Sequence, residues 1–368
     1  MVNVVLAGGG TAGHTSPLIA TAEALRLASD VTITCIGTPK GLETRVIPDA
    51  GLTLELIPPV PLPRKPSPAL LSVPIRLRDA VARAKAILTD HDADVLVGFG
   101  GYVSMPAYLA ARRLKLPIVI HEQNAVPGLA NRVAARFAAR VTVTFPDTPL
   151  PGAEVVGLPV RRALSDLAHS GRASRQEGSR ELFGLDANRP TLLVSGGSQG
   201  ARSINTALLG ARDALLAAGV QVLHVWGAKN FPEDAQVVTD PTTHARYVPV
   251  AYVDRMEQAY CAADLMLGRS GAGTVVETAI VGLPGVFVPL PHGNGEQARN
   301  ASALVAAGGA VLITDADLTA ERLTSDVLGR VDRPEVLAAM SHAGRALMSA
   351  DAASKLASIV LQVAGGTA

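Results

Sequence analysis

A glycine-rich turn that runs directly into a histidine is the first place in the sequence where chemistry is expected. Residues 8–14 read GGGTAGH and follow the apolar run VNVVLA. Gly8, Gly10 and Gly13 have the G-x-G-x-x-G spacing of strand-to-helix turns whose backbone N–H groups hold a phosphate. His14 falls at the start of the helix, where the dipole disfavours imidazolium and keeps the ring able to accept a proton. The residues alone leave two readings open, a general base and an ordinary packing histidine.

The same glycine spacing is also typical of dinucleotide sites. Such sites need an acidic residue at the end of the second strand, about 20 residues on, to hold the ribose. Here the second apolar run, VTITCIG, is followed by Thr38, Pro39 and Lys40, and Glu43 lies too far along the chain to serve. The sequence therefore argues against a dehydrogenase.

Three further turns of this kind occur, and the four fall two in each half of the chain. They lie at 98–101, 196–200 and 268–273. One alone would be weak evidence, because close packing of a strand against a helix also needs glycine. Four favour phosphate binding in both halves. In an open parallel sheet such turns lie at the carboxyl ends of the strands, where ligands bind.

A second cluster of polar residues accompanies the fourth turn. Residues 269–277 read RSGAGTVVE. Glu277 thus falls on the first turns of a helix, where it could accept hydrogen bonds from a ribose diol or simply compensate the helix dipole. Gln297 and Asn300 lie in a polar break between apolar runs. Amides suit the neutral hydroxyl groups of a sugar, although they are also common turn residues.

The elements that must position these residues alternate between short apolar strands and amphipathic helices. The runs VNVVLA, VTITCIG and LPIVI do not alternate with polar residues, which is typical of strands buried on both faces of a parallel sheet. The first helix is expected from about 16 to 28, and the stretch from about 334 to 364 is also helical. Residues 165–190 are polar and indicate a linker or an exposed helix, after which the pattern begins again at 191. The sequence predicts two similar α/β domains.

Composition excludes several classes of protein. The 368 residues carry a formal net charge of +1 and only 3% aromatic residues, which disfavours a nucleic-acid partner. With 48% apolar and 18% charged residues the chain can form a large core. No apolar run reaches the ~18 residues of a membrane span, and the N-terminus reads as a strand without a signal sequence. A cytosolic protein that can rest on a membrane surface is expected.

No metal or redox site is expected. Cys35 and Cys261 lie far apart in the chain and are interpreted as reduced, buried side chains. Two Asp-x-Asp triplets occur, at 92–94 and 315–317. The first precedes a strand, and the second leads into a helix, so turn and capping roles are favoured over a metal site.

The segment 57–88 is the candidate for contact with a lipid surface. Apolar residues recur at helical spacing after Pro74, among many arginines and lysines. We expect that helical stripe to face the domain core, and the proline-flanked stretch 70–75, with Leu70, Leu71 and Ile75, to contact the membrane.

Seven motifs, taken in order, resemble those of the MurG-type N-acetylglucosaminyltransferases of bacterial peptidoglycan synthesis. The resemblance runs from Val4 to about Gly309 and rests on GGGTAGH, GFGGYVSMP, HEQN, GLPVR, GGSQGARSIN, RSGAGTVVE and GLPGVFVPLPHGNGEQARNA. It implies the GT-B fold, an α/β architecture in which two Rossmann-like domains with parallel sheets face an interdomain cleft. The acceptor and membrane-facing domain would span 1–161, with a C-terminal helix at about 350–364 as a candidate to pack back onto it. The UDP-sugar domain would span 162–349.

The resemblance also implies an activity. Such an enzyme moves N-acetylglucosamine from UDP-N-acetylglucosamine to lipid I, the muramyl-pentapeptide pyrophosphoryl-undecaprenol acceptor, with inversion at the anomeric carbon, and gives lipid II. No metal or other cofactor is strictly required. The implied partners are the two substrates, the cytoplasmic membrane surface and other cell-wall synthesis proteins, with no nucleic acid. The implied location is peripheral, on the cytoplasmic face of the cell membrane.

Site residues follow by position in the motifs. His14 matches the base that deprotonates the acceptor hydroxyl. The acceptor side matches Gly10, Gly100, Gly101 and Tyr102. Donor-binding positions match Thr11, Ala12, Gly13, Asn124, Arg161, Ser198, Val253, Ala272, Gly273, Thr274, Val275, Val276, Glu277 and Gln297. Among these, Glu277 would hold the ribose and Gln297 the sugar hydroxyls. Two positions depart from the pattern: Ala12 stands where glycine is usual, and Glu296 replaces a glutamine.

Two alternatives to the transferase remain open at this point. A nucleotide-sugar epimerase of the same architecture would consume UDP-N-acetylglucosamine without any acceptor. A non-catalytic binding module would keep its function in cells without His14.

Overall fold

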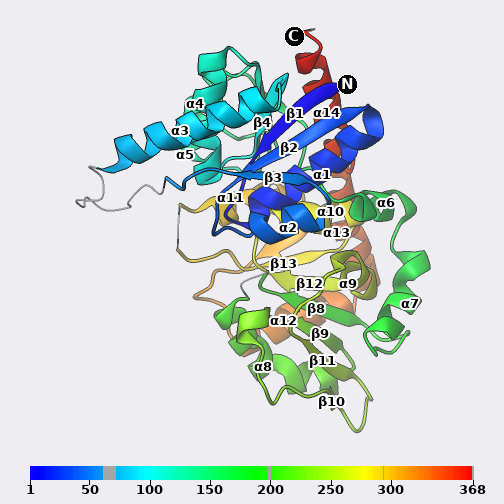
Figure 1. Cartoon of the computed structure of the whole chain (residues 1–368). Helices are drawn as coiled ribbons and strands as arrows, with labels where there is room; N and C mark the ends of the chain where they lie inside the picture. Colours follow the sequence, from blue (N-terminus) through cyan, green and yellow to red (C-terminus); the bar gives the residue numbers. More distant parts are fainter. Residues whose placement is uncertain (61–71, 198–199, 293, 367–368) are drawn as a thin grey trace. The chain divides into compact units, whose positions relative to one another are not determined.

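The computed structural model describes residues 1–60, 72–197, 200–292 and 294–366 (Figure 1). The chain divides into two compact units. Unit 1 comprises Met1–Arg162 together with Asp351–Ala368, and unit 2 comprises Ala163–Ala350. The division follows residue 162, next to the boundary expected after 161, and the C-terminal helix α14 (Ala352–Ala364) belongs to unit 1.

Unit 1 is built on a parallel sheet whose strands run in the order β3-β2-β1-β4-β5-β6-β7. Short apolar runs form the central strands β1, β4 and β5 because most of their side chains are buried between two layers of helices, whereas the edge strands β3 and β7 have no buried residue. The strands are β1 (Val2–Ala7), β2 (Val31–Gly37), β3 (Thr53–Leu56), β4 (Val95–Gly98), β5 (Ile118–Glu122), β6 (Arg140–Val143) and β7 (Ala153–Val155).

Helices cover both faces of this sheet (Figure 1). Alternate residues of β1 show the two layers: Val5 packs with α3, α4 and α5, whereas Val4 packs with α1, α2 and α14. The apolar stripe of α3 lies in the first of these cores, as expected. The helices are α1 (Ala12–Ala28), α2 (Glu43–Asp49), α3 (Val73–Asp90), α4 (Gly101–Leu114), α5 (Leu129–Ala134) and α14.

The first helix begins earlier than the sequence indicates. It starts at Ala12 rather than near Ser16, because the backbone N–H groups of His14 and Thr15 already donate to the Thr11 carbonyl. Pro17 therefore lies inside the helix rather than in its first turn. The consequence is that His14 belongs to the first helical turn, directly above the glycine turn.

Unit 2 repeats the design with strand order β10-β11-β9-β8-β12-β13-β14. All its pairings are parallel except that of the short edge strand β10 with β11. The strands are β8 (Thr191–Ser195), β9 (Gln221–Val225), β10 (Val238–Thr239), β11 (Arg246–Val250), β12 (Leu265–Gly268), β13 (Gly285–Phe287) and β14 (Ala310–Leu312). The helices are α6 (Arg162–Ser170), α7 (Ala173–Leu182), α8 (Arg202–Ala217), α9 (Met256–Ala262), α10 (Ala272–Val281), α11 (Glu296–Ala306), α12 (Ala320–Val331) and α13 (Pro334–Leu347), with a 3-10 turn at Ala228–Asn230.

Of the two alternatives for the polar stretch 165–190, the structure shows helices rather than a linker. The stretch forms α6 and α7, and the half-buried Arg172 and the buried Arg180 anchor it to the rest of unit 2. Arg180 pairs with Asp264 at 2.6 Å, and Arg172 donates to the carbonyls of Ala263 and Gly282. Charged residues thus tie this segment to the domain, because the donors of a guanidinium satisfy the carbonyls at the ends of neighbouring elements.

Two composition-based expectations can be compared with the structure. Cys35 and Cys261 are free and buried, as expected, and burial raises the pKa of the Cys35 thiol to about 12. Within the described residues, Pro334–Ala364 is the stretch with the length and composition of a membrane span. It is two helices, α13 and α14, rather than one. The apolar side chains of α14 pack in the core of unit 1, which explains their composition.

Candidate active site

The first two glycine turns meet at one edge of the unit 1 sheet. They follow β1 and β4, which are adjacent and parallel, so their carboxyl ends lie together. The Phe99 N–H and the Ser104 hydroxyl both donate to the Ala7 carbonyl, at 2.8 and 3.0 Å. A Cβ atom at Gly101 would lie only 3.0 Å from the Gly9 carbonyl oxygen. Bare glycine backbone is therefore what allows the two turns to touch.

His14 lies against the second turn. Its ring is 3.6 Å from the position a Cβ atom at Gly100 would occupy and 3.8 Å from that at Gly101. Its Nδ1 lies 3.0 Å from the Thr11 hydroxyl. When Nδ1–H donates to that hydroxyl, Nε2 is left as the proton acceptor. Gly100 and Gly101, predicted for the acceptor side, and Thr11, predicted for the donor side, thus lie around one imidazole.

The electrostatics of His14 favour a neutral ring. Burial lowers the pKa of His14, while the Glu43 carboxylate and the Gly9 carbonyl act in the opposite direction. The balance keeps the imidazole unprotonated at neutral pH. The sequence also predicted a neutral ring, but from the helix dipole; in the structure, burial is the largest cause.

The first amides of α1 are open to an anion. Thr11 is the N-cap residue, but its side chain makes no capping hydrogen bond. The N–H groups of Ala12 and Gly13 lie in the first helical turn, where intrahelical acceptors do not exist. Gly10 differs, because its N–H donates to the Glu43 carboxylate at 2.8 Å. This amide, predicted for the acceptor side, is already used within the protein.

Glu43 is the residue that sequence reasoning missed. It was set aside as too far from the second strand to hold a ribose, yet its side chain turns back onto the glycine turn. No sequence signal gives this direction, because Glu43 opens a helix after a loop of unpredictable course. The correction strengthens the argument against a dinucleotide, since a carboxylate occupies one of the turn amides that a pyrophosphate would need.

The HEQN motif forms a rigid support for Asn124. It ends β5, next to β4. The buried Glu122 accepts hydrogen bonds from the N–H groups of Asn124 and Gly128, both at 3.0 Å, and from the Asn131 side chain at 2.9 Å. Asn131 in turn accepts from the Tyr108 hydroxyl at 2.7 Å. Burial raises the pKa of Glu122 while these donors lower it. The motif therefore fixes the backbone that carries Asn124.

In unit 2, adjacent strands bring the predicted donor residues to one edge. The third and fourth turns follow β8 and β12, and the segment leading to Gln297 follows β13. Ser198 lies outside the described residues. α10 begins at Ala272, with Gly271 as an N-cap that makes no side-chain hydrogen bond. Its first amides, those of Ala272, Gly273 and Thr274, are therefore suited to a phosphate.

Several predicted donor residues can contribute only their backbone. Val275 and Val276 are buried in the core of unit 2, and Val253 is 9% exposed. In contrast, Arg161 and Tyr102, which lie in unit 1, are exposed.

The two polar residues predicted to read the sugar nucleotide are both held in place. Glu277 accepts a hydrogen bond from the Tyr260 hydroxyl at 2.8 Å, and burial raises the pKa of Tyr260. The Gln297 side-chain oxygen accepts from the Leu290 N–H at 2.9 Å. This bond fixes the orientation of the amide and presents its NH₂ group as the donor.

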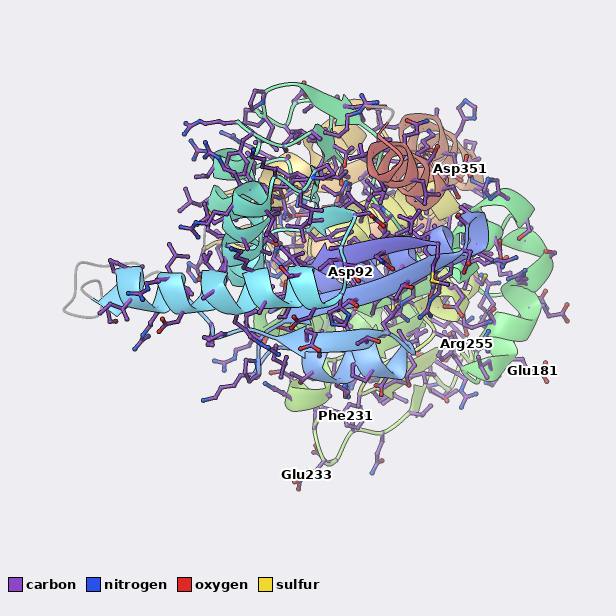
Figure 2. All side chains as sticks on the ribbon, turned by 45° about the horizontal axis from the view of Figure 1, so that its top comes forward. Asp92, Glu181, Phe231, Glu233, Arg255 and Asp351 are labelled. Atoms are coloured by element: carbon purple, nitrogen blue, oxygen red, sulfur yellow. The ribbon has the colours of Figure 1, made fainter. Side chains whose placement is uncertain are left out.

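The Asp-x-Asp triplets have structural partners. Asp92 lies where α3 ends (Figure 2), and Asp94 accepts from the Asn3 N–H at 2.8 Å, at the amino end of the sheet. Asp315 pairs with Arg269 at 2.5 Å, and Asp317 accepts from the Thr314 hydroxyl. Across the described ranges, no three His, Cys, Asp or Glu side chains gather as metal ligands would.

Comparison with known proteins identifies the family. The model of the glycosyltransferase family 28 N-terminal domain matches residues 4–143, and that of the C-terminal domain matches residues 191–356. The chain belongs to glycosyltransferase family 28. It is an enzyme, a glycosyltransferase, and its two Rossmann-like units are the GT-B architecture that the motifs implied.

Individual members of family 28 agree over the whole chain. A relative from Cutibacterium acnes, named UDP-N-acetylglucosamine--N-acetylmuramyl-(pentapeptide) pyrophosphoryl-undecaprenol N-acetylglucosamine transferase, is 61% identical over 99% of this chain and 98% of its own. A relative of the same name from a Nocardioides species is 58% identical over 100% and 99% of the two chains. The crystal structure of Acinetobacter baumannii MurG is 28% identical, covers 98% of this chain and 100% of its own, and has a TM-score of 0.77. The resemblance to MurG-type enzymes is confirmed.

Proposed function

We propose that this family 28 enzyme transfers N-acetylglucosamine from UDP-N-acetylglucosamine to the muramyl-pentapeptide pyrophosphoryl-undecaprenol acceptor, lipid I, and so makes lipid II for peptidoglycan. The observation that carries the proposal is the 61% identity over 99% of the chain to a transferase named for this reaction. Both glycine-turn edges fit it, because the donor contains a diphosphate and the acceptor a pyrophosphate.

His14 acts as the general base in this reaction. Its neutral imidazole takes the proton from the acceptor hydroxyl while that oxygen attacks the anomeric carbon of N-acetylglucosamine. The bond between that carbon and the UDP oxygen breaks, and UDP leaves with the bonding electron pair. A single displacement of this kind inverts the anomeric carbon. The pairing of His14 with Thr11, 3.0 Å away, supports the role because it fixes the ring.

Unit 2 supplies the contacts to the nucleotide and the sugar of the donor. The first amides of α10 and the helix dipole stabilise the negative charge of the diphosphate as UDP departs. Glu277 accepts the ribose hydroxyls, Gln297 donates to the sugar, and the backbone at Val253 contacts the uracil. Asn124, Arg161 and Ser198 complete the donor side, and Gly100, Gly101 and Tyr102 the acceptor side. No metal takes part, so chelation with EDTA should leave turnover unchanged.

The test is release of UDP with and without a lipid I analogue. The transferase releases UDP only when the acceptor is present. Consumption of UDP-N-acetylglucosamine alone would instead indicate an epimerase, and no release under either condition would refute the proposal.

The enzyme works at the cytoplasmic face of the cell membrane, where lipid I and other cell-wall synthesis proteins are found. The support is the start of α3, where Ile75 is 66% exposed beside Arg76 and Arg78. An exposed apolar side chain among arginines suits an anionic lipid surface. Leu70 and Leu71, expected to share this contact, lie outside the described residues.

Membrane contact is tested by sedimentation with anionic vesicles. Ile75→Ser should weaken binding, and the combined change with Leu70→Ser and Leu71→Ser should weaken it further, because apolar burial is lost while the charge is kept. The control is Leu209→Ser on α8, because the Leu209 side chain is also exposed, at 41%, and lies away from α3 in the sequence. Unchanged vesicle binding of the triple variant would remove this segment from the membrane contact.

A further inference from the structure

Glu43 is a buried carboxylate whose position is defined by the loops around the first glycine turn. The residue is 0% exposed. One oxygen accepts from the Gly10 N–H at 2.8 Å. The other accepts from the N–H and the hydroxyl of Thr38, at 3.0 and 2.8 Å. These donors come from the turns at the carboxyl ends of β1 and β2, so the side chain ties the two strand ends together.

Glycines clear the space that this carboxylate fills. A Cβ atom at Gly9 would lie 2.5 Å from the nearer Glu43 oxygen, and one at Gly37 would lie 2.7 Å from Glu43 Cγ. A Cβ atom at Gly41 would overlap the carboxylate itself. Three glycines, at the ends of β1 and β2 and in the connections that follow them, thus leave space where Glu43 passes. Backbone therefore surrounds the Glu43 side chain, which bonds the Gly10 and Thr38 amides. Amides of such turns would otherwise be available to a bound anion.

The turn that Glu43 holds is also the turn that holds His14. Gly10 donates to Glu43, while the hydroxyl of the next residue, Thr11, lies 3.0 Å from His14 Nδ1 and the Gly9 carbonyl raises the pKa of the ring. The Gly9 carbonyl oxygen also lies against Gly101, where an added Cβ atom would be only 3.0 Å from it. The segment from Gly9 to Thr11 therefore lies between the carboxylate and the imidazole, and a shift of this segment moves both contacts of the ring.

We infer that Glu43 is a positioning residue of this active site, an internal anion that occupies the first glycine turn and fixes the turn, and through it the ring of His14, for proton transfer. The inference rests on the proposed function of His14. It also assigns the Gly10 amide to the enzyme's own carboxylate, which leaves the amides of Ala12 and Gly13 to meet substrate phosphate.

A charged carboxylate does more here than a neutral amide of the same shape. The donors of Gly10 and Thr38 lower the pKa of Glu43 despite its burial, so the group is ionised at neutral pH. Its field raises the proton affinity of His14 against the effect of desolvation. A base desolvated without this compensation would accept protons poorly.

The surroundings of His14 contain few other charges. Glu43 on α2 is the charged side chain with a resolved influence on the ring. The second turn presents the backbone of Gly100 and Gly101, with the uncharged Asn131 amide beyond Gly100. On α1 the ring meets the Thr11 hydroxyl. If a substitution of Glu43 changes the pH dependence of UDP release, the change therefore reports on the interaction between Glu43 and His14.

The test compares Glu43→Gln and Glu43→Asp with Glu55→Gln in the full-length enzyme. Glu55 is a matched control because it lies in the same unit, in β3, and pairs with Arg83 at the surface at 2.9 Å. UDP release is measured against pH with the lipid I analogue. Glu43→Gln should lower kcat about 10-fold, a tenth of the scale of losing the base itself, with little change in KM for UDP-N-acetylglucosamine. Its acid limb should move to lower pH, because the His14 pKa falls when the nearby negative charge is removed.

Glu43→Asp keeps the charge but shortens its reach, so it should retain more activity than Glu43→Gln and keep an acid limb nearer that of the parent enzyme. Glu55→Gln should match the parent. Thermal unfolding and UDP binding are measured on each variant. If Glu43→Gln is unstable, Glu43→Asp decides the matter. Its shorter side chain should still lower kcat and shift the His14 pKa, measured by NMR, by a smaller amount. A parental kcat with an unshifted His14 pKa would overturn the inference.

Failure of this inference differs from failure of the proposed function. If the parent enzyme releases UDP and His14→Ala does not, the function stands. Parental kcat and pH profile in Glu43→Gln would then refute only the positioning role. Lost activity with an unmoved acid limb would also refute it, because a purely structural role predicts that result. No UDP release by the parent enzyme would refute the proposed function itself.

Discussion

The first and fourth glycine turns look alike in the sequence and differ in what surrounds them. Both follow a buried parallel strand and open a helix whose N-cap residue makes no side-chain capping hydrogen bond. At the first turn a carboxylate, Glu43, enters and takes the Gly10 amide. At the fourth, the charged residue is Arg269, which points to Asp315 and Ser203. Glycine spacing thus predicts the turn, whereas residues distant in sequence decide which charge the turn meets.

This difference separates the chemical tasks of the two units. An internal anion at the first turn leaves less room for substrate charge there and supports a base at His14. At the fourth turn, the first turn of α10 contains no acidic residue, so its own sequence does not compensate the helix dipole there. The comparison agrees with proton transfer in unit 1 and diphosphate binding in unit 2.

Removal of the imidazole tests the first turn most directly. His14→Ala should lower kcat by ~100-fold or more, the scale of a lost general base. Binding of UDP should not change, because the proposed nucleotide site lies in unit 2. Turnover is measured by UDP release and binding by calorimetry. His342→Ala, at an exposed position on α13, is the control and should match the parent. Retained turnover in His14→Ala would falsify the catalytic role.

The local part of this architecture could be predicted from sequence. Apolar runs such as VNVVLA and TLLVS specify strands buried on both faces, and the glycine turns mark where each strand gives way to a helix. The apolar stripe of α3 faces the core as its spacing indicates. These features depend on residues close together in the chain, so their spacing is enough to predict them.

Two of the features that sequence reasoning missed depend on long-range hydrogen bonds, and a third, the start of the first helix, depends on local ones. Glu43 reaches a turn 33 residues earlier in the chain. Arg180 anchors a segment that was predicted to be a linker or an exposed helix by pairing with Asp264, 84 residues away. The predicted start of the first helix was wrong because Thr11 already accepts the first helical bonds. Polar side chains have no periodicity that reveals their partners, so composition alone makes such segments look exposed.

Substitution of Glu277 tests the fourth glycine turn and the donor binding proposed for it. Glu277→Gln should raise KM for UDP-N-acetylglucosamine about 10-fold with little effect on kcat, because a hydrogen bond to a charged group contributes about 1.5–3 kcal/mol and 1.4 kcal/mol corresponds to a factor of ten. Tyr260→Phe should have a smaller effect, since it removes the hydroxyl that holds Glu277 but keeps the carboxylate. Steady-state kinetics with varied donor measure both. An unchanged KM in Glu277→Gln would exclude the ribose contact.

The smallest expected effect comes from Gly101, where the first two turns touch. Gly101 has φ +82°, and an added Cβ atom would lie 3.0 Å from the Gly9 carbonyl oxygen. Gly101→Ala should lower the free energy of unfolding by about 1–2 kcal/mol for the left-handed backbone and lower kcat several-fold, because the Gly9 segment that holds His14 must move.

Gly152 is the control that separates the loss of unfolding free energy from the loss of kcat. It has φ +64° with no atom within 4 Å of the added Cβ position. Gly152→Ala should therefore show a similar loss of unfolding free energy in denaturant titrations and keep the parental kcat. If both variants lose activity equally, a strained backbone anywhere in unit 1 would be enough to lower kcat. The close approach of the first two turns would then have no special part in catalysis. If only Gly101→Ala loses activity, the position of the Gly9 carbonyl matters to the base, as the pairing of His14 with the first turn requires.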